Sequence, residues 1–79
     1  MKETVQNILA GNKDAFRDIV RKYAPGIRAF LASSLSDPQN VDDLTQETFI
    51  AAYQNLEKLD LDMDLGSWIK GIAKNKLKM

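Results

Sequence analysis

The fold of this chain is decided by residues 41–56, VDDLTQETFIAAYQNL. At 100° per residue this stretch forms a helix with a broad apolar side, which has Phe49 and Tyr53 at its edge. The apolar side consists of Val41, Leu44, Thr45, Thr48, Ala51, Ala52 and Leu56. Ile50 lies in the opposite, polar arc, which is formed by Asp43, Gln46, Glu47 and Gln54. A large apolar side chain among hydrogen-bonding groups suits a partner better than solvent, so we expect this arc to bind another molecule.

Length and composition limit the range of structures. The 79 residues suffice for one small domain, and the apolar fraction of 44% is typical of a folded one. The chain has no Cys and no His, which removes disulfides, thiolate metal sites and the commonest general base. No apolar run approaches the ~18 residues of a membrane span, and no secretory signal opens the chain. We therefore expect a cytoplasmic protein without a membrane partner.

The charges cancel overall but are segregated along the chain. Residues 41–64 contain seven Asp or Glu and one Lys, whereas residues 65–79 contain four Lys and no acid. Such a distribution can serve two partners of opposite charge. Two solvated helix faces would explain the charge distribution equally well, so charge alone does not identify a site.

Helical spacing also organises the residues before this stretch. Residues 1–11 are expected to form a short helix with Thr4 as its N-cap, and Gly11 can end it. Residues 12–35 carry a long apolar stripe that Pro25 interrupts, so they form either one kinked helix or two helices in tandem. The stripe, which we assign to core packing, comprises Phe16, Ile19, Val20, Tyr23, Ile27, Phe30, Leu31 and Leu35.

A turn-forming segment at 36–40 precedes the central helix. We expect Asn40 to cap a helix over 40–56, which would place Asp42 and Asp43 in its first turn, where carboxylates favour the helix dipole. Residues 57–64 alternate apolar and acidic side chains. Because an isolated strand would have no partner, we interpret them as a loop that turns Leu59, Leu61 and Met63 inward.

The last predicted helix runs from 65 to 79, with Asp64 as its cap. Its apolar side contains Leu65, Trp68, Ile69, Ile72 and Ala73, and Leu77 borders it. The opposite arc combines lysines with small or amide side chains, namely Ser67, Lys70, Gly71, Lys74, Asn75 and Lys78. Such an arc can approach a phosphate backbone, although lysines near a helix C-terminus also suit the dipole. Gly71 is explained equally well by close packing against a helix or by close approach of DNA.

No set of side chains supports catalysis or a cofactor. The chain has no Gly-rich phosphate loop and no Ser-His-Asp set, so we expect that it is not an enzyme. Asp60, Asp62 and Asp64 superficially suggest a calcium loop, but the Gly and terminal Glu of an EF-hand are missing at the required positions. We therefore expect no metal site.

Three motifs in order resemble a known family. Residues 43–49, DLTQETF, resemble the D-L-x-Q-E-x-F signature of bacterial RNA polymerase sigma factors, in region 2 of the extracytoplasmic-function (ECF) type. Upstream, Ala15-Phe16 and Tyr23-Ala24-Pro25 resemble the A-F…Y-A-P run of the family. Downstream, residues 68–75 resemble its W-[LI]-x-x-I-A-x-N helix. The resemblance covers residues 12–79.

The resemblance implies an all-α fold, a compact bundle of about four helices over residues 1–79. It implies a transcription initiation factor domain, monomeric when free, that docks on the β′ clamp helices of core RNA polymerase and contacts the minus-ten element on the non-template strand. By position, docking is carried over to Asp43, Gln46 and Glu47, and the helical wheel adds Ile50 as an apolar anchor. DNA contact is carried over to Asn75 for a base edge and to lysines for phosphates, namely Lys70, Lys74 and Lys78.

The sequence also departs from the family pattern. Leu65 stands where Phe is usual, Gly66 follows where a polar residue is common, and the loop at 59–64 holds three Asp. The helix-turn-helix domain of the family is absent, so we expect either an isolated region 2 or a divergent short paralogue. The alternative function is a helical interaction module that does not bind DNA but keeps a surface for the polymerase or for an anti-sigma factor.

Overall fold

The computed structural model of the chain describes residues 6, 8, 11, 13–59 and 62–78. The regular elements in these ranges are all helical, which confirms the predicted all-α class. They are the 3-10 helix η1 (Lys13–Ala15), α2 (Phe16–Ala32), α3 (Pro38–Gln54), the 3-10 helix η2 (Leu56–Lys58) and α4 (Leu65–Leu77). The expected count of four helices is not confirmed. Of the helix expected at 1–11, only Gln6 and Ile8 are described as helical, and the N-cap Thr4 lies outside the described residues.

Residues 16–32 form one α-helix that continues through Pro25, which resolves the two alternatives for this segment. The predicted stripe faces the interior: Ile19, Ile27 and Leu31 are buried, and Phe16, Val20, Tyr23 and Phe30 pack half-buried against the core. This packing on both sides of Pro25 compensates for the helical hydrogen bond that proline cannot donate. Beyond the helix, Leu35 also packs against the core.

The prediction that Asn40 caps the central helix is wrong. Helix α3 begins at Pro38, and the Asp37 carboxylate accepts a hydrogen bond of 2.9 Å from the Gln39 backbone N–H. Proline is favoured at the first helical position because its fixed φ suits the helix and its missing donor would be unpaired there anyway. The earlier start removes Asp42 and Asp43 from the first turn. Instead, Asp42 forms an ion pair with Arg28 of α2.

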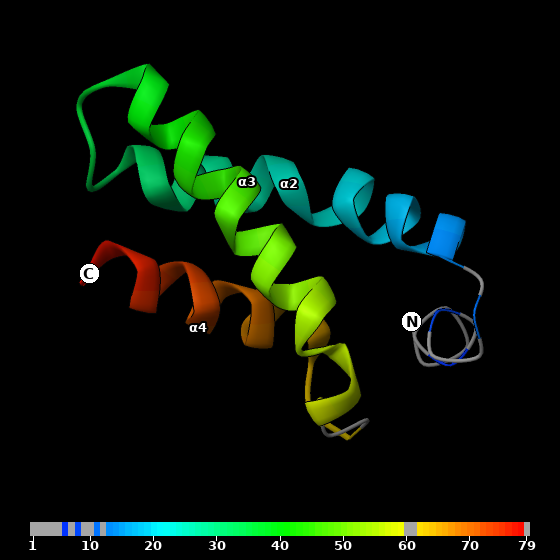
Figure 1. Ribbon diagram of the computed structural model, residues 1–79. Helices are drawn as coiled ribbons and strands as arrows, with labels where there is room; N and C mark the ends of the chain where they lie inside the picture. The colour runs from blue at the N-terminus through cyan, green and yellow to red at the C-terminus, as the bar shows by residue number, and fades with distance from the viewer. Residues whose placement is uncertain (1–5, 7, 9–10, 12, 60–61, 79) are drawn as a thin grey trace.

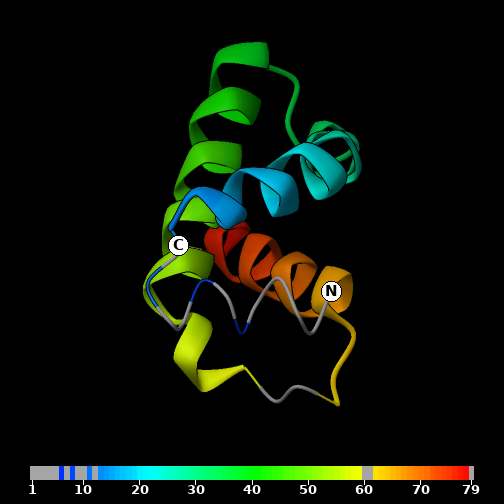
Figure 2. The ribbon, with the colours of Figure 1, turned by 90° about the vertical axis from the view of Figure 1, so that its right-hand side faces the viewer.

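Helix α3 lies diagonally across both α2 and α4 (Figure 1), and each of the three helices contacts the other two. The view turned by 90° shows α2 and α4 on the same side of α3 (Figure 2). The core fills the space between them, and its largest fully buried side chains are Ile19, Leu31, Thr48, Leu56 and Ile69. One side of α3 is therefore left to face outward.

Two threonines take part in this core. Thr45 and Thr48 are buried, and each hydroxyl donates a 2.7 Å hydrogen bond to the carbonyl four residues earlier, on Val41 and Leu44. A buried hydroxyl without a partner would be unfavourable by roughly 1–3 kcal/mol. Both are satisfied inside α3, so they pack as nearly apolar side chains, as their place on the predicted apolar side requires.

The segment between α3 and α4 is partly helical. Residues 56–58 form η2, and Leu59 is buried as predicted. The inward position expected for Met63 is wrong, since this side chain is 48% exposed, and Leu61 lies outside the described residues. Asp64 caps α4 as predicted, accepting from the backbone N–H and the hydroxyl of Ser67 at 2.9 and 3.0 Å. Helix α4 ends at Leu77, while Met79 lies outside the described residues.

Candidate functional site

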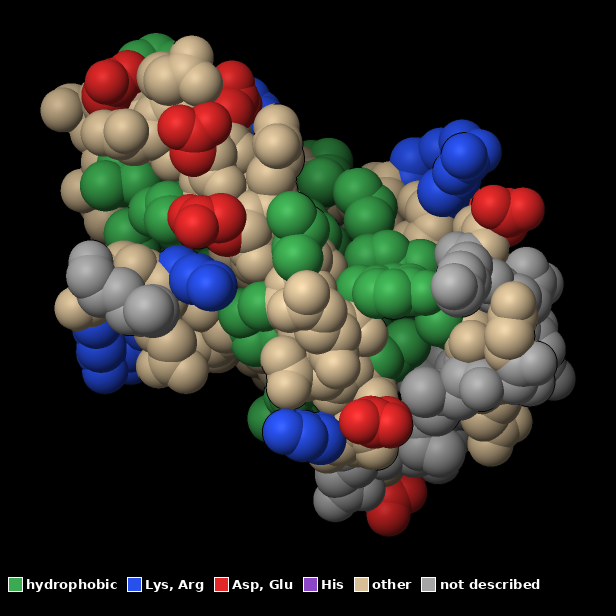
Figure 3. All heavy atoms as spheres, viewed as in Figure 1, with side chains coloured by type: hydrophobic (Ala, Val, Ile, Leu, Met, Phe, Trp, Pro, Cys, Tyr) green, Lys and Arg blue, Asp and Glu red, His purple; other side chains and the backbone are tan. Residues whose placement is uncertain are grey.

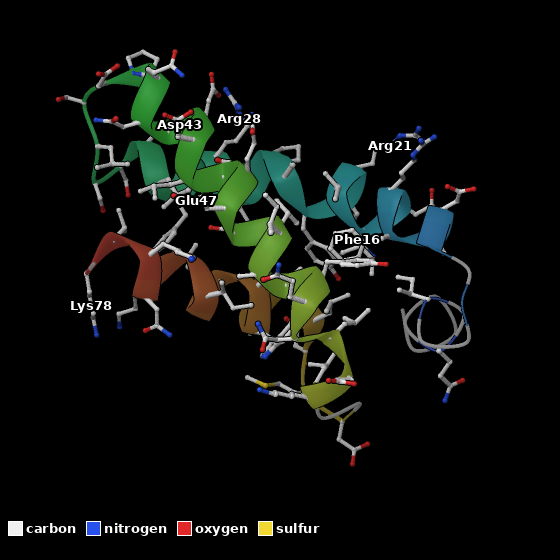
Figure 4. The ribbon with its side chains drawn as sticks, viewed as in Figure 1. Phe16, Arg21, Arg28, Asp43, Glu47 and Lys78 are labelled. Atoms are coloured by element: carbon white, nitrogen blue, oxygen red, sulfur yellow. The ribbon has the colours of Figure 1, made fainter. Side chains whose placement is uncertain are left out.

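The outward side of α3 carries the first group of predicted site residues. Asp43, Gln46, Glu47 and Ile50 are all exposed there, and we call them the α3 outer face. Their spacing of three, four and seven residues from Asp43 places them on neighbouring turns of one helix surface. Figure 4 shows Asp43 and Glu47 on α3, and in Figure 3 acidic side chains gather over the first half of this helix. The structure therefore brings all four residues together.

Ile50 is the apolar element of this face. Its side chain is 56% exposed, the largest value among the exposed large hydrophobic residues that the structure describes. One turn further, Tyr53 is 37% exposed and packs edge-on against Phe16, with ring centroids 5.2 Å apart and planes at 81°. Sequence reasoning placed Tyr53 only at the edge of the buried side. Its position three residues after Ile50 is the signal that would have added it to the exposed apolar surface.

An apolar groove continues this surface toward α2. It has a volume of about 440 Å³. Its lining residues come from α2 and α3 and are Phe16, Arg17, Val20, Arg21, Ala24 and Tyr53. Figure 4 shows Phe16 directed toward α3 and Arg21 directed away from the helix bundle. The apolar surface beside Ile50 is therefore wider than one helix.

A second surface lies along α4. A groove of about 390 Å³ runs over this helix and the residue before its cap, and we call it the α4 groove. It is lined by Met63, Ser67, Trp68, Gly71, Ile72, Lys74, Asn75 and Lys78. Three of the four predicted DNA contacts, Lys74, Asn75 and Lys78, are thus brought together. Sequence reasoning assigned Trp68 and Ile72 to the core alone, and it missed Met63 because the loop conformation places it there.

Lys70 is separated from this group. Its ammonium nitrogen lies 5.0 Å from the centre of the Phe30 ring in α2, a cation–π geometry. Lys70 also does not line the α4 groove, and it borders α2 instead. The structure therefore gives Lys70 a contact within the fold that the other two lysines do not have.

Gly71 is one of the residues that line the α4 groove. Apart from the adjacent residues and the backbone of its own helix, a Cβ atom added at this position would meet no heavy atom within 4 Å. This excludes one of the two explanations considered for Gly71, close packing against a neighbouring helix. The glycine leaves a bare patch of helix between Trp68 and Lys74.

The acidic loop before α4 is less open to ligands than its sequence indicates. The carboxylate of Asp64 is engaged by Ser67 at the helix start, and Asp62 also has a partner within the chain. Asp60 lies outside the described residues. The carboxylate of Asp64 thus serves the fold, and it faces the first turn of α4, where the helix dipole favours a negative charge.

Comparison with known proteins identifies the family. Residues 19–79 match the family described as Sigma-70 region 2. The chain belongs to this sigma-70 region 2 family. Its relatives include the ECF RNA polymerase sigma factor SigW of Bacillus subtilis, which is 32% identical over 75 residues that cover 95% of this chain and 40% of the relative. No solved structure matches the chain.

Two further relatives are also RNA polymerase sigma factors. CnrH of Cupriavidus metallidurans is 34% identical over 87% of the chain and 36% of its own length. The RNA polymerase sigma-H factor of Pseudomonas aeruginosa is 32% identical over 98% of the chain and 40% of its own length. The chain thus spans about two fifths of the length of these relatives.

In the part of the chain that the structure describes, no helix is long and apolar enough to cross a membrane.

Proposed function

We propose that this region 2 domain is a transcription initiation module that docks on core RNA polymerase through the α3 outer face. The proposed partner is the pair of β′ clamp helices, and the role is binding without an enzymatic step. The observation that carries the proposal is the exposure of Ile50 among Asp43, Gln46 and Glu47 on a helix that otherwise packs against α2 and α4. A role at RNA polymerase also places the protein in the cytoplasm.

The chemistry of this face suits a helical partner with basic flanks. Ile50 supplies an apolar anchor, which contributes most where it is fully desolvated in an interface. Glu47 and Asp43 supply negative charge at the rim, which accelerates encounter with a basic surface more than it strengthens the final complex. The groove beside Tyr53 adds apolar area on the α2 side. Together they provide an apolar centre with an acidic border on α3, while Arg17 and Arg21 border the groove on α2.

The docking proposal is tested by replacing Gln46, Glu47 and Ile50 with Ala and measuring binding to an isolated β′ clamp-helix fragment. All three side chains are exposed, so the variant should keep the helical circular dichroism and melting temperature of the wild type. Affinity should fall at least about tenfold, as expected for loss of a central anchor. A matched control replaces three exposed residues outside α3, Asp14, Asp18 and Ser34, with Ala and should bind normally. Unchanged binding of the first variant would show that the face is wrongly assigned.

We further propose that the α4 groove contacts the non-template strand of the promoter minus-ten element. Lys74 and Lys78 would neutralise phosphates, and Asn75 would donate and accept at a base edge. What supports this is their convergence on one groove with an apolar wall at Trp68 and Met63. Apolar and aromatic surfaces next to cations are the usual components of single-strand binding sites.

The DNA proposal is tested by titrating a fluorescent minus-ten oligonucleotide with the chain at several salt concentrations. Two phosphate contacts predict a slope of log K against log salt of about −1.4, since each single-strand contact contributes ~0.7. The double variant Lys74→Ala with Lys78→Ala should lose this slope. Binding that is independent of salt in the wild type would contradict the lysine assignment.

The alternative, an interaction module without DNA binding, has one observation in its favour, the acidic segment before α4. Such a module would present the α3 outer face to the polymerase or to an anti-sigma factor. Retained clamp binding with no detectable binding of minus-ten DNA, either alone or with core polymerase, would favour this alternative.

A further inference from the structure

Gly71 stands out because the fold gives no reason for a glycine at this position. Glycine in a helix interior is less favourable than alanine by about 1 kcal/mol, so its presence calls for a local cause. Its φ is not positive, and apart from the adjacent residues and the backbone of its own helix, no heavy atom lies within 4 Å of the Cβ that another residue would carry. By contrast, a Cβ at Gly66 would lie 2.9 Å from the Tyr23 ring, so that glycine is required by packing.

The surroundings of Gly71 are those of a ligand groove. Residues three, four and seven positions away, which are Trp68, Ser67, Lys74, Asn75 and Lys78, all line the α4 groove together with Gly71. On the helix, Trp68 and Asn75 lie to one side of Gly71 and Lys74 lies to the other. Gly26 of α2 is equally free of neighbours, but it lines none of the grooves described for this chain.

We propose that Gly71 is the point where the sugar–phosphate backbone of a single DNA strand lies directly against α4. The inference rests on the proposed DNA contact and adds the position at which the strand crosses the helix. With no side chain at residue 71, a phosphodiester can approach the helix backbone closely while Lys74 and Lys78 neutralise it from the same arc. A methyl group at residue 71 would occupy that space without changing any charge.

The test compares Gly71→Ala with Gly26→Ala, because both add a methyl group at an open helical position. Each should raise the melting temperature, since alanine is the better helix former. Only Gly71→Ala should weaken binding of the single-stranded minus-ten oligonucleotide, by about fivefold to tenfold. Its salt slope should equal that of the wild type, because both lysines remain. The same loss should appear with an oligonucleotide made abasic at the minus-ten positions, since the contact is with the sugar–phosphate backbone.

Results that contradict the Gly71 contact can be told apart from results that contradict the proposed DNA function. If the wild type and both variants bind DNA equally, the inference is overturned while the proposed function stands. If Gly71→Ala lowers the melting temperature, the glycine serves the fold and the inference is likewise overturned. A loss that vanishes with the abasic oligonucleotide assigns the contact to a base and rejects the backbone contact. A wild type that binds no DNA, alone or with core polymerase, overturns the proposed DNA function and the inference with it.

Discussion

Gly66 at the start of α4 lies directly against Tyr23 of α2: a Cβ on Gly66 would stand 2.9 Å from Cε1 and 3.3 Å from Cδ1 of the tyrosine ring. The first turn of α4 is thus in contact with the middle of α2. Tyr23 belongs to the Y-A-P motif, whereas Gly66 is a departure from the family pattern. The contact explains that departure, because a larger residue at position 66 would collide with the ring.

We predict that Gly66→Ala destabilises the domain. The added methyl group displaces the half-buried Tyr23 ring, and overpacking of this kind costs about 1–3 kcal/mol, which outweighs a gain in helix propensity of at most ~1 kcal/mol. Urea denaturation measures the change. Gly26→Ala serves as the control and should be stabilising. Combining Gly66→Ala with Tyr23→Leu should recover part of the loss, and purely additive effects would argue against the contact.

A second prediction concerns the start of α3. Asp37→Ala removes the N-cap and should lower the free energy of unfolding by about 1 kcal/mol, equivalent to roughly 4–8 °C in melting temperature. Asn40→Ala should change it by less than about 0.5 kcal/mol, because Asn40 is an exposed residue inside the helix. Thermal melts of the two variants compare the residue that caps the helix with the one the sequence indicated. Equal losses would contradict a helix that begins at Pro38.

A third prediction separates two lysines of α4. Lys70→Ala loses the contact with Phe30 and should cost about 0.5–1 kcal/mol of stability, with little change in the salt slope of DNA binding. Lys74→Ala should leave stability unchanged and reduce that slope by ~0.7. Urea denaturation and salt titrations of both variants check the pair. If Lys70→Ala reduced the salt slope and Lys74→Ala reduced the stability, the two assignments would have to be exchanged.

A fourth prediction concerns the ion pair between Arg28 and Asp42, which joins α2 to α3. Its side chains are 52% and 44% exposed, so solvent screening limits its contribution to about 0.2–1 kcal/mol. A double-mutant cycle with Arg28→Ala and Asp42→Ala should give a coupling in this range at low salt. The coupling should fall toward zero in 1 M salt. A coupling that persists there would mean that the pair is shielded from solvent.

Much of the fold could be predicted from apolar spacing and capping. The stripe of α2, the buried side of α3 and the Asp64 cap of α4 follow from residues near one another in the sequence. The open alternative at Pro25 and the wrong cap at Asn40 both arose where local signals competed. Pro25 is a helix breaker locally, and only its packed neighbours show that α2 continues. At the start of α3, the Asp37-Pro38 pair prevailed over Asn40 as the capping signal.

The candidate surfaces were predictable to different degrees. The α3 outer face depends only on helical register, so the sequence sufficed to group its four residues. The α4 groove also needs Met63, whose exposure depends on how the loop is placed. The position of Lys70 depends on Phe30, forty residues earlier, and spacing along one helix carries no information about such a contact.

The inward bonding of Thr45 and Thr48 has a consequence for how the helices hold one another. Both hydroxyls donate to carbonyls of their own helix, so neither bonds to another helix. Among the described residues, the polar link between different helices is the Arg28–Asp42 ion pair. Apart from Lys70 on Phe30, the other contacts found between helices in the described part of the chain are packing of core side chains, which has no fixed direction. A small tilt of α3 therefore breaks no hydrogen bond of Thr45 or Thr48. The helix can change its orientation slightly, so that the α3 outer face adjusts to a rigid partner.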